Sequence, residues 1–92
     1  MTFAEYVATR DALEARMKAA SDRLASFPKT GPMGLTGDET RALPDWQAAK
    51  REFDSAFAAL RELNARHVKR FARELREAQA ARRMAMLERA GQ

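Results

Sequence analysis

The residues that interrupt helices are confined to one short part of this chain. All three prolines lie between positions 28 and 44, and so do three of the four glycines. Proline and glycine are the residues least compatible with a helix interior. The sequence on either side contains neither residue until Gly91, so it predicts two helices joined by one irregular connection.

In the segment before the connection, mostly apolar residues recur at the spacing of one face of a helix, which we call the seam. Alternating steps of four and three residues join Tyr6, Arg10, Leu13, Met17, Ala20, Leu24 and Phe27, and Phe3 extends the series by one turn. Pro28 disfavours helical geometry at the residue before it. We therefore predict a first helix over residues 2–26.

The segment after the connection predicts one continuous helix over residues 44–89, about 69 Å long at 1.5 Å per residue. Its apolar face fits an 11-residue spacing better than a heptad, which gives a nearly straight seam. The residues on this face are Trp46, Phe53, Phe57, Leu60, Val68, Phe71, Leu75 and Ala78. Within the connection, Thr36 and Glu39 match the T-x-x-E of a capping box and predict one short turn of helix to about Ala42.

These elements predict an all-α fold, an antiparallel helical hairpin with a short first helix and a long second helix. The connection over residues 27–43 contains the short capped turn, and residues 1–92 form a single domain. Folding back places Leu24 near Trp46, Met17 near Phe53 and Phe57, and Phe3 near Val68. Beyond about Phe71 no first helix lies alongside, so residues 72–92 form a C-terminal overhang.

Two helices bury only part of each apolar face, so we expect a partner to complete them. We predict a homodimer, either a four-helix arrangement or a longer coiled coil, with parallel and antiparallel pairing both open. The expected interface residues are Leu13, Met17, Leu24, Trp46, Phe53, Phe57, Leu60, Phe71, Leu75, Met84, Met86 and Leu87. Arg10 and Asn64 interrupt the two faces; they either fix the register or, for Arg10, extend to the edge.

The connection contains three regularly spaced glycines, a residue type that is common in phosphate-binding loops. Gly31, Gly34 and Gly37 are spaced G-x-x-G-x-x-G. A phosphate-binding loop needs a terminal G-K-[ST] after a strand, and a dinucleotide site needs a βαβ unit. Neither is present, so these glycines indicate turns.

The chain offers no recognisable catalytic or metal-ligating constellation. It has no cysteine, and His67 is its only histidine, with no second ligand at the spacing of a metal site. No nucleophile, base and orienting group can be assembled from the sequence. We expect no enzyme, no catalytic residue, no cofactor, no metal and no small-molecule substrate.

The excess positive charge lies in the last third of the chain. The net charge is +4, and residues 65–92 contain eight basic and three acidic residues. On one continuous helix, five cations would share a face, and we call them the basic stripe: Arg66, Lys69, Arg70, Arg73 and Arg76. Such a stripe suits phosphates, although Glu74 and Glu77 dilute it and no aromatic side chain lies beside it to stack on bases. A solvated face is the favoured interpretation, and nucleic-acid binding is the alternative.

No targeting or membrane segment is legible. The N-terminal residues carry charges every few positions, and nowhere do 18 apolar residues run together. We expect a cytoplasmic protein without membrane association.

Residues 27–71 contain FPKTGPMGLT followed by a proline-initiated helix with QAAKREFDSAFAALRELN. This segment resembles a group of small, uncharacterised proteins encoded by proteobacterial phages and prophages. In that group a similar F-P-x-G-P-M-G-L-T connection precedes a Q-A-A-K-x-x-F/Y-D-x-A-F-A-A-L-R-x-x-N helix. Gly37 and Leu43 stand where the group tends to have Pro and Thr, which weakens both helix starts. The resemblance implies a phage-linked origin and brings with it no activity and no site residue.

Together these observations predict a small, non-enzymatic protein-interaction module. We expect it to self-associate and to bind a host or phage protein, in the bacterial cytoplasm or in a virion. It would serve as a virion or assembly part, or as an inhibitor of a host defence or regulatory protein. The alternative is a nucleic-acid-binding accessory protein that uses the basic stripe.

Overall fold

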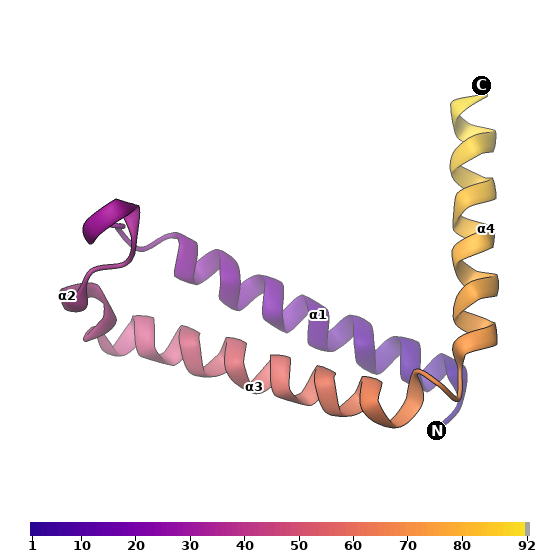
Figure 1. The fold of residues 1–92 in the computed structure, drawn as a ribbon, viewed down its shortest axis with the longest axis horizontal. Coiled ribbons are helices and arrows are strands. Elements are labelled where there is room, and N and C mark those ends of the chain that lie inside the picture. The colour runs from indigo at the N-terminus through magenta and orange to yellow at the C-terminus, as the bar shows by residue number, and fades with distance from the viewer. Residues whose placement is uncertain (92) are drawn as a thin grey trace.

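The computed structural model describes residues 1–91 and contains, within this range, only helices, turns and loops. α1 (Phe3–Ala25) and α3 (Pro44–His67) run side by side in opposite directions (Figure 1). The connection holds a 3₁₀ turn, η1 (Pro32–Gly34), and a short helix, α2 (Asp38–Arg41), and α4 (Ala72–Ala90) follows α3. The predicted all-α class and the hairpin are confirmed.

The ends of α1 follow from local side-chain chemistry. Thr2 Oγ1 accepts a hydrogen bond from the Glu5 N–H at 3.1 Å, and Glu5 Oε1 accepts one from the Thr2 N–H at 3.1 Å. This reciprocal pair is a capping box, which satisfies two of the free N–H groups at the helix start. The helix ends at Ala25, close to the predicted boundary, with Pro28 shortly after it.

The capping box predicted at Thr36 is wrong. α2 begins at Asp38 with Gly37 as its N-cap, and no side chain caps it. A Cβ added to Gly37 would lie 3.0 Å from Thr30 Oγ1, so the position leaves little room for a larger residue. Thr36 thus lies in the loop, and the helix starts one residue later than a capping box at Thr36 predicts.

The seam between α1 and α3 follows a heptad in both helices. Its buried and half-buried positions in α1 are Phe3, Tyr6, Arg10, Leu13, Met17, Ala20 and Leu24. Those in α3 are Trp46, Ala49, Phe53, Ala56, Leu60, Leu63 and His67. Alternating steps of three and four residues keep these side chains on one face of each helix. The 11-residue spacing predicted for the second helix is wrong because it omitted Ala49 and Ala56, which are both 0% exposed.

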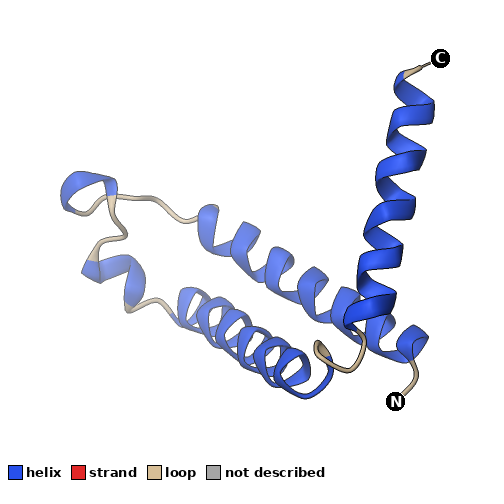
Figure 2. Cartoon of the chain, turned by 45° about the vertical axis from the view of Figure 1, so that its right-hand side comes forward, coloured by secondary structure: helices blue, strands red, loops and turns tan. Residues whose placement is uncertain are grey.

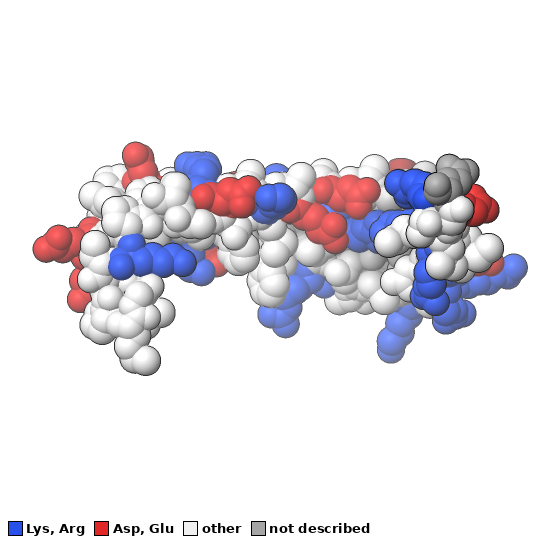
Figure 3. Space-filling model, turned by 90° about the horizontal axis from the view of Figure 1, so that it is seen from above, with Lys and Arg blue, Asp and Glu red and all other residues white. Residues whose placement is uncertain are grey.

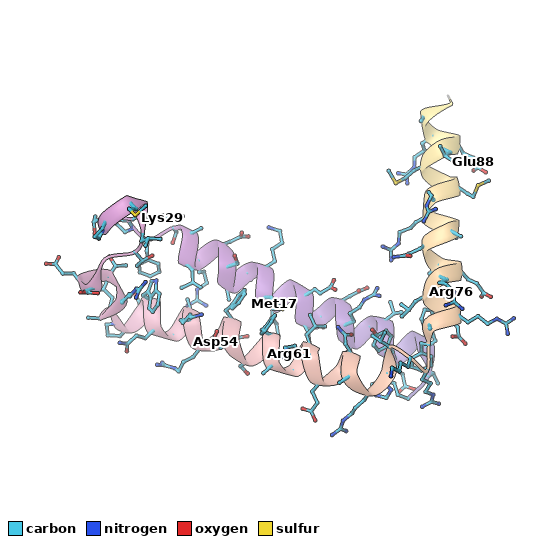
Figure 4. The ribbon with its side chains drawn as sticks, viewed as in Figure 1. Met17, Lys29, Asp54, Arg61, Arg76 and Glu88 are labelled. Carbon is cyan, nitrogen blue, oxygen red and sulfur yellow. The ribbon has the colours of Figure 1, made fainter. Side chains whose placement is uncertain are left out.

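Two polar pairs cross the hairpin. Tyr6 Oη donates to Asn64 Oδ1 at 2.8 Å, and Arg16 Nε donates to Glu52 Oε1 at 2.7 Å. Farther along, one hollow beside the connection is lined by both Leu24 and Trp46, in agreement with the predicted pairing. Figure 4 places Met17 between α1 and α3.

The continuous second helix predicted over residues 44–89 is wrong, because α3 ends at His67 and α4 begins at Ala72. After Leu63 and His67 the heptad would place Arg70 on the seam, whereas the apolar residue is Phe71, one position later. Phe71 leaves helical geometry, with φ −104° and ψ 16°. The turn brings its ring into the seam, where it is only 6% exposed. Burial of this ring accounts for a break without glycine or proline.

α4 stands away from the hairpin near the N-terminus (Figures 1 and 2). The chain has a radius of gyration of 18.1 Å, whereas a compact domain of its length would have one of about 12 Å. None of the residues of α4 is buried. The predicted overhang therefore exists, but as a separate helix that points in its own direction.

Candidate protein-interaction site

An aromatic cluster marks the point where α1 begins, α3 ends and α4 departs. It consists of Phe3, Tyr6, His67 and Phe71. The ring centroid of Phe71 lies 5.6 Å from that of Phe3, 5.5 Å from that of Tyr6 and 6.0 Å from that of His67. These separations are typical of favourable aromatic pairs. The cluster thus anchors the start of α4 on the hairpin.

Next to this cluster, a groove of about 430 Å³ lies between the first half of α1 and the first half of α4. We call it the α1–α4 groove. The side chains of α1 that line it are Phe3, Val7, Arg10 and Glu14, and those of α4 are Leu75, Arg76, Ala78, Gln79 and Arg82. Apolar and charged side chains from two distant parts of the sequence therefore meet in one concave surface.

Positively charged side chains outnumber negatively charged ones in the groove. Arg10 Nε and Nη2 both donate to Asp11 Oδ1 at 3.2 Å, and the Arg10 side chain is 19% exposed. Within residues 1–91, neither Arg76 nor Arg82 forms an ion pair. Figure 4 shows Arg76 at the base of α4. Three arginines thus share this surface with a single lining carboxylate, Glu14.

The free half of α4, residues 83–90 beyond the groove lining, exposes large apolar side chains. Met84, Met86 and Leu87 are 59%, 65% and 63% exposed. At about 100° per residue, Met86 lies on the same face of α4 as Leu75 and Arg82, one turn beyond the groove. Met84 and Leu87 lie on the other side of the helix. α4 therefore carries two distinct apolar surfaces.

The structure divides the predicted interface residues into two groups. Contacts within the chain bury or half-bury Leu13, Met17, Leu24, Trp46, Phe53, Leu60 and Phe71. These side chains form the hairpin itself. The remaining ones lie at the seam edge (Phe57), in the groove (Leu75), or on the free half of α4 (Met84, Met86 and Leu87).

The basic stripe does not lie on one helical face. Arg66 belongs to α3, Lys69 and Arg70 to the turn, and Arg73 and Arg76 to α4. The predicted common face is wrong because the turn interrupts the count of residues per helical turn. Arg66 also pairs with Glu62 at 2.8 Å, and Arg73 pairs with Glu77 at 3.2 Å. Figure 3, which looks down α4, shows Lys and Arg projecting around α4 and along one edge of the hairpin.

The two polar residues predicted to interrupt the seam both lie against Tyr6. Asn64 accepts its hydrogen bond from Tyr6, and the Arg10 guanidinium lies 5.9 Å from the centre of the Tyr6 ring. Tyr6 is therefore the residue that links the two. His67 belongs to the aromatic cluster, and its Nδ1 is buried without a hydrogen-bond partner.

Sequence reasoning missed four of the nine residues that line the α1–α4 groove, namely Val7, Glu14, Gln79 and Arg82. No sequence signal indicates them, because the groove depends on the direction in which α4 leaves the hairpin. Thr2 and Glu5 were also missed as a capping box, although their T-x-x-E spacing is visible in the sequence.

Comparisons with protein-family models, with curated proteins and with solved structures find no match to this chain. Within residues 1–91, no helix has the length and apolar character needed to cross a bilayer. The same range contains no group of three His, Cys, Asp or Glu side chains placed to hold a metal ion.

Proposed function

We propose that this protein is a small, non-enzymatic protein-interaction module in which the hairpin is the scaffold and α4 binds a protein. The observation that supports this proposal most strongly is that α4, a helix of 19 residues, has no buried residue. Most helical stability in proteins comes from packing one face of the helix against its surroundings. A partner that covers α4 would supply that packing.

The exposed apolar side chains of α4 support the same function. Met84, Met86 and Leu87 lie within four consecutive positions near the free end. Clustered exposed apolar side chains mark interaction sites on soluble proteins. Methionine is unbranched and flexible, which suits a surface that adapts to its partner.

The first partner that we propose is a second copy of the chain. Ala80, Met84 and Leu87 follow one another at steps of four and three residues, so they share one face of α4. Pairing of two α4 helices through this face would remove these side chains from water. The result would be a homodimer of bundle or coiled-coil type.

The second partner that we propose is a host or phage protein in the bacterial cytoplasm or in a virion. The resemblance of residues 27–71 to phage and prophage proteins supports this choice. The module would then be a virion or assembly part, or an inhibitor of a host defence or regulatory protein.

Light scattering and affinity capture from a bacterial lysate test the proposal. We expect a concentration-dependent dimer that the double substitution Met84→Glu and Leu87→Glu converts to a monomer. At protein concentrations low enough for both proteins to be monomeric, we expect them to unfold at the same temperature. The pair Ala12→Glu and Ala15→Glu, at exposed positions of α1, adds the same charge and is expected to leave the dimer intact. A wild-type monomer at every concentration, together with no captured protein, would contradict the proposal.

A gel shift with random duplex DNA tests the alternative function. Binding that weakens steeply with salt, and that is lost when Lys69, Arg70 and Arg73 are replaced by glutamine, would favour a nucleic-acid-binding accessory protein. We expect no shift at low salt.

A further inference from the structure

We propose that the α1–α4 groove binds an acidic amphipathic helix of a partner protein. This inference rests on the proposed function and adds to it the chemistry of the bound segment. It uses a surface of α4 different from the Met84 and Leu87 face through which we expect the dimer to form.

The shape of the groove suits a helix. From Leu75 to Met86, α4 offers one face about 17 Å long, or three turns. A helix of about 12 residues laid along this face would also contact the start of α1, where Phe3 and Val7 line the same groove. It would complete a three-helix arrangement and cover the apolar side chains of the groove.

The floor of the groove selects for apolar side chains on the bound helix. Phe3, Val7, Leu75 and Ala78 line the groove and are only half-buried. Helices that dock in such grooves anchor with apolar side chains at positions i, i+3, i+4 and i+7. The bound segment therefore needs a face of leucine-like residues.

The charges of the groove select for carboxylates beside that apolar face. Arg76 and Arg82 make no ion pair within residues 1–91, and Arg10 reaches the groove from the opposite side. Guanidinium groups bind carboxylates through two parallel hydrogen bonds, with more geometric specificity than lysine provides. Asp or Glu on both flanks of the bound helix would meet these arginines.

The arginines of the groove make the helices of a second copy of this chain poor occupants of it. α4 contains five basic and three acidic residues, and α1 and α3 each contain four of both signs. A second α4 in the groove would bring arginines against arginines, and α1 or α3 would add no net negative charge. The apolar floor likewise makes a poor contact for a phosphate backbone, which is bound through cations and polar groups.

The test uses the full chain and a fluorescently labelled helical peptide with leucines at steps of three and four and glutamates on both flanks. We expect saturable binding by fluorescence anisotropy that weakens as salt is raised. A scrambled peptide of the same composition is expected not to bind, and neither is one with every glutamate replaced by lysine.

Charge reversal locates the binding site. We expect Arg82→Glu to weaken binding of the glutamate peptide about tenfold, and the double variant with Arg76→Glu to weaken it further. Arg83→Glu makes the same change of charge on α4, at a position outside the groove lining. We expect the affinity of this variant for the glutamate peptide to stay within about twofold of wild type. The double variant is expected to gain binding of the lysine peptide.

Two results would overturn the inference: no binding of the glutamate peptide by the wild-type chain, or equal losses for Arg82→Glu and Arg83→Glu. Competition by random duplex DNA at the same arginines would also overturn it in favour of a nucleic-acid site. If the peptide fails while the wild-type chain still dimerises or captures a bacterial protein, only the groove inference falls. If all three fail, the proposed function falls with it.

Discussion

The hairpin and α4 are built from similar residues and differ in what they pack against. α1, α3 and α4 contain 23, 24 and 19 residues, and all three are rich in alanine and charge. α1 and α3 place an apolar or small residue at nearly every third or fourth position along one face. In α4 the large apolar residues fall on two different faces. The comparison shows that the spacing of apolar residues decides which helices of this chain associate with each other.

The hairpin also shows how little side-chain volume a tight seam needs. Ala20, Ala49 and Ala56 are 1%, 0% and 0% exposed. The distance between packed helices depends on the side chains at the contact, so small residues allow close approach. The larger side chains then fill the flanks of the seam, where Phe53 and Leu60 are half-buried.

The largest effect is expected where the hairpin meets α4. Replacing Phe71 with alanine removes a buried ring that contacts Phe3 and Tyr6, and we expect a loss of about 3–5 kcal/mol in the free energy of unfolding. Urea denaturation followed by circular dichroism measures it. Phe57→Ala is the matched control, because this ring is 44% exposed and its loss is expected to cost much less. Equal losses would show that the aromatic cluster does not hold the corner.

The alanine seam can be broken by a larger side chain. Ala56→Leu forces methyl groups into a contact with no free space, and we expect a loss of about 1–3 kcal/mol in stability. Ala58→Leu, at an exposed position of the same helix, is expected to change stability by less than about 0.5 kcal/mol. A seam that accepts leucine at Ala56 as easily as at Ala58 would contradict the close approach of α1 and α3.

The polar link across the hairpin is expected to have a smaller effect. Tyr6→Phe removes the hydrogen bond to Asn64 and leaves a part-buried amide oxygen unpaired, so we expect a loss of about 0.5–1.5 kcal/mol. A double-mutant cycle with Asn64→Ala measures the coupling between the two side chains. Additive losses would mean that this bond does not fix the register.

The smallest expected effect concerns the ion pair of the hairpin. The hydrogen bond from Arg16, followed by its positive charge, lowers the pKa of Glu52 below its ordinary value of 4.5. A carboxylate with a lowered pKa stabilises the folded state above pH 4.5, and this contribution disappears as the pH falls through the folded-state pKa. Because both side chains are more than 40% exposed, the effect is small.

Thermal unfolding of wild type and Glu52→Gln at a series of acidic pH values measures this contribution. We expect the unfolding temperature of wild type to fall more steeply on acidification. Glu5 also stabilises the folded state less as the pH falls, because its hydrogen bonds with Thr2 lower its pKa. The Glu52→Gln variant therefore keeps part of the pH dependence of the unfolding temperature. Parallel curves for the two proteins would contradict the role of the Arg16–Glu52 pair.

The hairpin was predictable from the sequence because local rules determine it. Pro28 and Pro44 bound the connection, and the apolar spacing of α1 identifies its buried face. The break after His67 was not predicted, since the segment has neither glycine nor proline. Two successive steps of four, from Leu63 through His67 to Phe71, are a visible sign of it. The α1–α4 groove was beyond prediction because it depends on where the Phe71 ring packs, which is a tertiary contact.

Residue-resolved amide hydrogen exchange on dilute protein tests most directly whether the hairpin is stable by itself while α4 lacks a packing partner within the chain. We expect slow exchange in the seam, at Leu13, Ala20, Ala49 and Ala56, because these amides exchange only when the hairpin opens. We expect fast exchange over residues 80–90, where the helix frays without a partner. Exchange in that range as slow as in the seam, under conditions where the protein is monomeric, would contradict the distinction between the two regions.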